Sequence, residues 1–255
     1  MPLDEFPSRG PDLLHKAVVY GKPNVIRALL ERGDDPELKA EDCIHDAALS
    51  GCVDCVNILV TEAGVDPDLV DHDLFGCCSW TPFLAAVLYG NRDVVEWLLN
   101  TGRVNTTREL FRRTTNPLQF AVQEKPHLAQ LLLDHPKAKE DRRALGVTEE
   151  EYLGPRILTL AASGGDGQLF RWLLSRLGYP TASDDSSRAW MGHLLTDAQR
   201  EKLEEAFHEA VQLANIDIVR LLLENYLLPP GDPDPPFLFD TRMVWSLREG
   251  TTCAI

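Results

Sequence analysis

One short pattern returns about six times along this chain of 255 residues. Its clearest copy begins at Thr81 and reads TPFLAAVLYG, and the leucine pair Leu98 and Leu99 follows it. A helix of small residues, a glycine turn and a leucine-rich helix make one unit that cannot bury its apolar face alone. Copies must therefore stack on one another, which predicts an all-α solenoid of helix-turn-helix units.

The pattern resembles the ankyrin repeat. The small residue that marks the first helix recurs at Ala17, Ala47, Ala86, Ala121, Ala161 and Ala210. Successive markers are 30, 39, 35, 40 and 49 residues apart, whereas a regular ankyrin repeat keeps about 33. The surplus falls between the second helix of one copy and the first helix of the next, where the finger-like turns of this family project. The resemblance implies a stack of six helix pairs with long finger insertions.

The segments outside the repeats differ in composition. We expect a flexible lead-in over 1–11, the repeat domain over 12–226 and a proline-rich tail over 227–255. The last repeat of a solenoid exposes an apolar flank, so the tail is interpreted as a C-terminal cap. The alternative is a partner-binding peptide. Capping boxes at Thr148 and Thr196 predict helix starts inside the two longest insertions.

The charge balance excludes some classes of partner. The formal net charge is −15, from 25 basic and 40 acidic side chains, which argues against nucleic acid and anionic membranes. No apolar run approaches the ~20 residues of a membrane span, and the N-terminus does not read as a signal peptide. We therefore expect a cytoplasmic or nuclear protein. Residues 103–143 are the exception, with nine basic and five acidic side chains.

The six cysteines are scattered, and reduced thiols fit the expected compartment. Cys52, Cys55, Cys77 and Cys78 could together form a zinc site, since zinc takes four ligands from two such pairs. The preferred interpretation is structural, because Cys55 takes the position of Val94 in the third copy. The sequence therefore predicts neither a metal nor another cofactor.

Histidine offers no catalytic centre here. His15, His45 and His208 occupy one equivalent position in three copies. In the ankyrin family, the imidazole at this position hydrogen-bonds the turn backbone and links neighbouring repeats. Nucleotide-binding, serine-hydrolase and zinc-protease motifs are absent from the sequence, and we predict no catalytic residue.

A binding surface is the main functional prediction. In the ankyrin arrangement, the two positions before each turn glycine tend to face the concave groove, and in the first three copies they are mostly apolar or aromatic. The predicted partner-binding residues are Tyr20, Leu49, Trp80, Leu88, Tyr89, Arg112 and Arg113. The resemblance implies a protein or peptide partner whose apolar groups enter the groove. Acidic groups of that partner would meet Arg112 and Arg113.

The rival hypothesis is an enzyme. The insertion over 177–206 could roof the groove and close a small-molecule pocket, since a repeat scaffold does not exclude chemistry. A deep pocket with a strongly perturbed carboxylate or histidine would favour this alternative. A wide open groove would favour binding.

Overall fold

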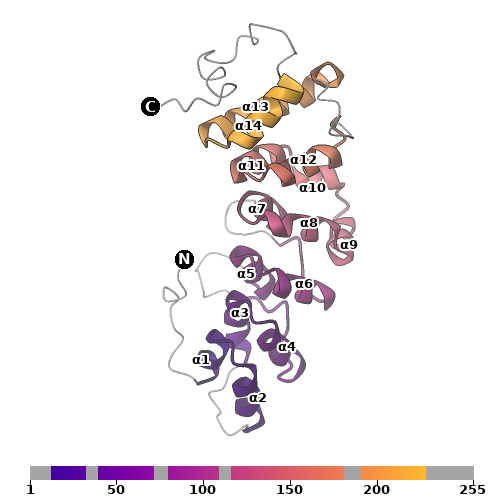
Figure 1. The fold of residues 1–255 in the computed structure, drawn as a ribbon. Helices are drawn as coiled ribbons and strands as arrows, with labels where there is room; N and C mark the ends of the chain where they lie inside the picture. Colours follow the sequence, from indigo (N-terminus) through magenta and orange to yellow (C-terminus); the bar gives the residue numbers. More distant parts are fainter. Residues whose placement is uncertain (1–12, 33–39, 72–79, 109–115, 181–190, 228–255) are drawn as a thin grey trace. The chain divides into compact units, whose positions relative to one another are not determined.

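The computed structural model describes residues 13–32, 40–71, 80–108, 116–180 and 191–227 (Figure 1). Within these ranges the regular structure is helical, apart from one isolated antiparallel bridge between Asp71 and Trp80. Contacts divide the chain into two compact units. The first unit contains the residues up to Ala121 together with His127–Gly146, and the second contains Val122–Pro126 with the residues from Val147 onward.

The first unit is built from helix pairs. The helices are α1 (Leu13–Val19) with α2 (Pro23–Arg32), α3 (Ala40–Ser50) with α4 (Val53–Thr61), and α5 (Pro82–Tyr89) with α6 (Arg92–Asn100). First helices pack on first helices, α1 on α3 and α3 on α5, and second helices pack likewise, α2 on α4 and α4 on α6 (Figure 1). This two-row stacking confirms the helix-turn-helix unit that the repeated pattern predicts.

The third pair shows why these residues fold locally as they do. The Thr81 hydroxyl accepts a hydrogen bond from the Leu84 N–H at 3.3 Å and caps α5, while Pro82 needs no partner at the first helical position. Gly90 ends the helix with a φ of +77°, a conformation that glycine adopts without steric cost.

Three further helices follow α6 in the chain. They are α7 (Pro117–Glu124), α8 (Pro126–Asp134) and α9 (Pro136–Ala144). A single residue separates α7 from α8, against two or three in the other pairs, and Pro126 opens α8. The α9 helix is an insertion that packs against α6.

The second unit repeats the paired arrangement. Its elements are α10 (Glu149–Leu153), α11 (Ile157–Gly164), α12 (Gly167–Arg176), the 3-10 turn η2 (Gly192–Leu194), α13 (Asp197–Gln212), α14 (Ile216–Leu222) and the π-helical turn η3 (Leu223–Leu227). Here α11 packs on α13 and α12 on α14. The capping boxes predicted at Thr148 and Thr196 are both formed and open α10 and α13.

The extra elements α9, α10 and η2 all lie between a second helix and the next first helix. The insertions therefore fall where the spacing of the marker alanines places them, outside the packed pairs. The predicted lead-in and the tail from residue 228 onward lie outside the described residues. The domain boundaries and the capping role of the tail stay predictions.

Candidate functional site

An asparagine clamp joins consecutive pairs in the first unit. Asn91 precedes α6, and its side-chain amide donates to the carbonyl oxygens of Ala48 and Leu49 at 2.7 and 2.9 Å. These carbonyls belong to the last turn of α3, where helix geometry leaves them without intrahelical donors. A Cβ added to Gly51 would lie 3.0 Å from the Asn91 side-chain oxygen. Glycine at the turn therefore lets the next repeat approach closely.

The second unit uses the same clamp. Asn215 precedes α14 and donates to the carbonyls of Ala162 and Ser163 at 2.6 and 3.2 Å. A Cβ on Gly165 would lie 2.8 Å from the Asn215 oxygen. The same turn-to-turn contact is thus present in both units.

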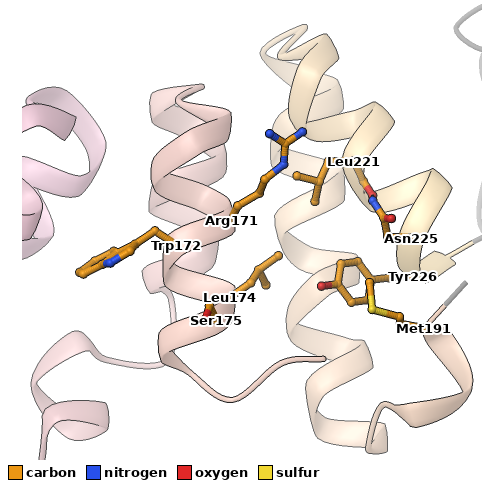
Figure 2. A pocket seen from close by; sticks show the side chains of 8 residues that line it. All are labelled: Arg171, Trp172, Leu174, Ser175, Met191, Leu221, Asn225 and Tyr226. Carbon is orange, nitrogen blue, oxygen red and sulfur yellow. The ribbon is translucent and has the colours of Figure 1, made fainter. Parts of the chain in front are cut away.

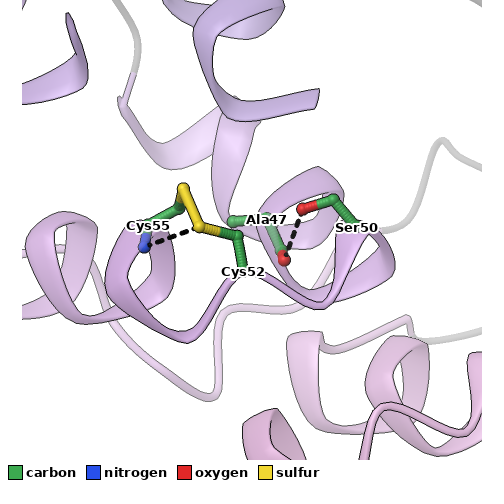
Figure 3. Close-up of a disulfide and its surroundings, with 4 residues drawn as sticks. All are labelled: Ala47, Ser50, Cys52 and Cys55. Carbon is green, nitrogen blue, oxygen red and sulfur yellow. Dashed lines mark hydrogen bonds between the residues drawn. A yellow bond between two sulfur atoms is a disulfide. The ribbon is translucent and has the colours of Figure 1, made fainter. Parts of the chain in front are cut away.

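The equivalent position in the second pair is Cys52, which faces the turn at Gly21. A Cβ on Gly21 would lie 3.8 Å from the Cys52 sulfur. Cys52 is bonded to Cys55 in a disulfide, and its sulfur accepts a hydrogen bond from the Cys55 N–H at 3.2 Å (Figure 3). The expectation of reduced thiols is therefore wrong for this pair. The disulfide also takes up two of the four sulfurs that a zinc site would need, and Cys77 and Cys78 lie outside the described residues.

The predicted partner-binding residues differ in exposure. Tyr20 is 72% exposed, whereas Leu49 is 4% and Trp80 2% exposed. Leu49 lies on α3, which is packed between α1 and α5. Trp80 is held at the base of its finger by two backbone hydrogen bonds with Asp71. These two side chains therefore belong to the core and present no surface to a partner.

Two other predicted residues, Leu88 and Tyr89, are half-buried at the end of α5. Arg112 and Arg113 lie outside the described residues. The pattern did not single out Leu13, which is 66% exposed and begins α1, seven residues before Tyr20 in the turn that follows this helix. The spacing of seven residues between Leu13 and Tyr20 is the sequence signal that could have identified it.

The three equivalent histidines have different surroundings. His45 is 1% exposed, and its ring nitrogen lies 3.1 Å from the Leu69 oxygen and 3.2 Å from the Trp80 oxygen. It thus ties the finger backbone to α3, as the resemblance implies. His15 instead lies 3.0 Å from the Asp46 carboxylate, and His208 hydrogen-bonds the Glu204 carbonyl of its own helix.

Ion pairs occupy much of the basic segment. Arg103 lies 3.5 Å from Asp66, and Arg108 lies 3.4 Å from Asp68. Lys137 and the Thr106 hydroxyl and N–H all bind Asp141. Burial favours the neutral acid, but these hydrogen bonds prevail and hold the pKa of Asp141 below its ordinary value. Many of the segment's positive charges are therefore satisfied within the chain.

The second unit contains a pocket of about 360 Å³ between α12 and α14 (Figure 2). It is lined by Arg171, Trp172, Leu174, Ser175, Met191, Leu221, Asn225 and Tyr226. The Tyr226 hydroxyl donates to the Pro180 carbonyl at 2.6 Å, and burial, with a smaller contribution from Tyr179, raises the pKa of Tyr226 to about 12. None of the lining residues is an aspartate, glutamate or histidine. This pocket lacks the acid–base group that the enzyme alternative requires.

A wider hollow of about 500 Å³ lies between α11 and α13. Its lining mixes both signs of charge, with Arg156, which precedes α11, and Glu205, His208 and Glu209 from α13. Among the described residues, no group of three or more His, Cys, Asp or Glu is arranged to hold a metal ion. No helix in the described ranges is both long enough and apolar enough to cross a bilayer.

Comparison with solved structures shows the same fold. The ankyrin repeat domain of human ASB11 aligns over 93% of this chain and 98% of its own, with 20% identity and a TM-score of 0.52. A chain from the complex of the predatory endopeptidase Bd0816 of Bdellovibrio bacteriovorus with immunity protein Bd3460 aligns over 83% of this chain and 99% of its own. The identity there is 16% and the TM-score 0.53.

Sequence comparison assigns the family. No curated protein matches the chain. A family model of three ankyrin repeats matches residues 3–71 and 44–144, which together cover more than half of the chain. The paired helices, the glycine turns and this match agree. The chain belongs to the ankyrin-repeat family, an all-α solenoid fold that generally serves as a protein–protein interaction module.

Proposed function

We propose that this chain is a protein-recognition module whose contact surface follows α1 and the turns after α1 and α5. This turn-edge face is defined by Leu13, Tyr20, Leu88 and Tyr89. The exposure of Tyr20, 72% in a residue type favoured as an interface anchor, is the observation that carries the proposal. Leu13 extends the apolar surface along α1, and the exposed Lys16 lies between them.

The proposed partner is a protein or peptide that offers apolar side chains to this face. An aromatic ring that is exposed in the free protein gains most when a partner covers it, since burial contributes about 25 cal/mol per Å² of apolar area. Acidic groups on the partner would suit Lys16 at the rim, as well as Arg112 and Arg113. The ion pairs of Arg103 and Arg108 leave those side chains less able to contribute.

Two findings support recognition over catalysis. Ankyrin repeats generally bind proteins, and one similar chain comes from a protein–protein complex. In addition, the pocket between α12 and α14 is lined without a carboxylate or an imidazole, and the hollow between α11 and α13, which contains both, is the more open of the two. An adaptor or regulatory subunit fits this combination, and an intracellular site of action follows from the expected compartment.

The test compares Tyr20→Asp with a matched variant, Leu213→Asp. Leu213 is 50% exposed and precedes the turn of the last described pair, as Tyr20 does in the first. Proteins captured from lysate by the wild-type chain are identified by mass spectrometry, purified and titrated against both variants by calorimetry. We expect Tyr20→Asp to weaken binding at least tenfold and Leu213→Asp to leave it unchanged.

Circular dichroism and thermal melting check that both variants fold. Equal weakening by both variants, or by neither of them, would contradict the assignment of the partner to the turn-edge face. Leu88→Ala and Tyr89→Ala then map the far end of this face. Alanine is used there because both residues are half-buried and a charge would disturb α5.

A further inference from the structure

The pair Cys52 and Cys55 stands apart from the other repeats. At the position of Cys52, the third and last described pairs have the clamp residues Asn91 and Asn215. At the position of Cys55, the third pair has the buried Val94. Among these three pairs, only the second has a disulfide in place of the asparagine clamp.

A structural crosslink explains this disulfide poorly. Its cysteines are separated by only three positions and lie in one turn that the α4 backbone already orders. A disulfide stabilises a fold mainly by restricting the unfolded chain, and that effect is smallest for the shortest loops. Cys52 also makes no asparagine-type hydrogen bond to the preceding repeat. A chemical role therefore explains this disulfide better than a structural one.

The two cysteines differ in exposure. Cys55 is 0% exposed, whereas Cys52 is half-buried and begins the turn that leads into α4 (Figure 3). An external thiolate can reach only one sulfur, because exchange requires an approach to the sulfur that is attacked. The asymmetry gives the pair an accessible member and a protected member.

The local field favours a charged sulfur at position 52. Cys52 is the N-cap of α4, a helix of nine residues, and the Cys55 N–H donates to its sulfur at 3.2 Å. The positive end of a helix and a backbone N–H both stabilise a thiolate. Asp54 lies in the same turn and opposes that charge, but it is exposed to solvent, which weakens its effect.

We propose that Cys52 and Cys55 form a thiol–disulfide exchange site whose reactants are dithiols and their disulfides. A thiolate of the incoming dithiol attacks the Cys52 sulfur, the Cys52–Cys55 bond breaks, and Cys55 leaves as a thiolate that takes up a proton. The second thiol of the reactant then loses its proton and attacks the reactant's other sulfur in the mixed disulfide, and Cys52 leaves as a thiolate that takes up a proton. Two electrons pass to the protein, and the dithiol becomes a cyclic disulfide.

This inference is independent of the proposed partner-binding face. The test equilibrates the full chain in mixtures of reduced and oxidised dithiothreitol, quenches with acid and labels free thiols. Mass spectrometry then reports the oxidation of each cysteine. We expect Cys52 and Cys55 to change together and reversibly with one two-electron midpoint, while the buried Cys43 stays a thiol throughout. A pair that stays reduced, or stays oxidised, at every ratio in the folded protein would overturn the proposal.

Two variants test which of the two cysteines reacts with an external disulfide. Each variant introduces the residue that the third pair has at the same position. Cys55→Val copies Val94, and Cys52→Asn copies Asn91. With oxidised glutathione, Cys52 in Cys55→Val should form a trapped mixed disulfide at least tenfold faster than Cys55 in Cys52→Asn. Equal rates in two variants that retain the wild-type circular dichroism spectrum would remove the assignment of Cys52 as the attacked sulfur.

Discussion

The first helices α5 and α13 belong to different units and show how one repeat plan yields different surfaces. The α5 helix is buried at every position from Pro82 to Val87. The α13 helix buries only Leu203, Ala206, Phe207 and Ala210, and it leaves Glu205 and His208 exposed. Yet the turns that follow both helices are clamped to a neighbouring pair by the same kind of contact. The packing device is shared, while the exposed surface depends on what each helix has beside it.

The largest expected effect comes from two substitutions, each of which should unfold only the unit that contains it. Ala86 and Ala210 are both 0% exposed at the close approach of the first helices. Aspartate at either site buries a charge without a partner, which should cost about 3–5 kcal/mol. Hydrogen exchange should show lost protection in the first unit for Ala86→Asp and in the second for Ala210→Asp. Full protection in either variant would mean that the repeat register is wrong at that site.

A smaller effect is expected at Gly164, where α11 lies against the backbone of α7. Its equivalents Ser50 and Tyr89 carry side chains, but a Cβ on Gly164 would lie 2.5 Å from the Gln123 carbonyl oxygen. This backbone atom cannot move without shifting α7, so Gly164→Ala should destabilise the second unit by about 1–3 kcal/mol. Urea unfolding measures the change. Ser50→Ala serves as the control, with an expected change within about 0.5 kcal/mol.

The clamps should be worth similar amounts in the two units. Asn91→Ala and Asn215→Ala each remove two hydrogen bonds to helix-end carbonyls. We expect each to cost about 1–2 kcal/mol, measured by the urea midpoint and by hydrogen exchange in the helices that lose the contact. A cost at one site alone would show that the clamp is not a common property of the repeat.

The smallest expected effect is a stabilisation. The turn after α13 has Ala214 at a φ of +56°, where Gly51 and Gly165 occupy the other clamped turns. Ala214→Gly removes the steric cost of a side chain in the left-handed region and should add about 0.5–1 kcal/mol, after the entropy cost of glycine. Gly165→Ala should have the opposite sign. A loss of melting temperature for Ala214→Gly would contradict this account.

Much of the fold was predictable because its signals are local. The Thr148 and Thr196 capping boxes and the glycine turns depend on residues only a few positions apart, and each is formed as predicted. The candidate site was less predictable. Leu49 was predicted to lie at the surface from its register and Trp80 from its place in a finger, but both side chains are buried.

The sequence alone determined the repeating unit, the family and the position of the insertions, because helix periodicity, caps and glycine turns are encoded within each copy. Only the tertiary structure decided which of the predicted residues are exposed, that Asn91 and Asn215 reach back to the preceding turn, and that Cys52 bonds to Cys55. These features depend on contacts between residues that are brought together by stacking or by a helical turn. The exposure and the bonding of these side chains therefore depend on distances in space, which cannot be read from the order of the residues.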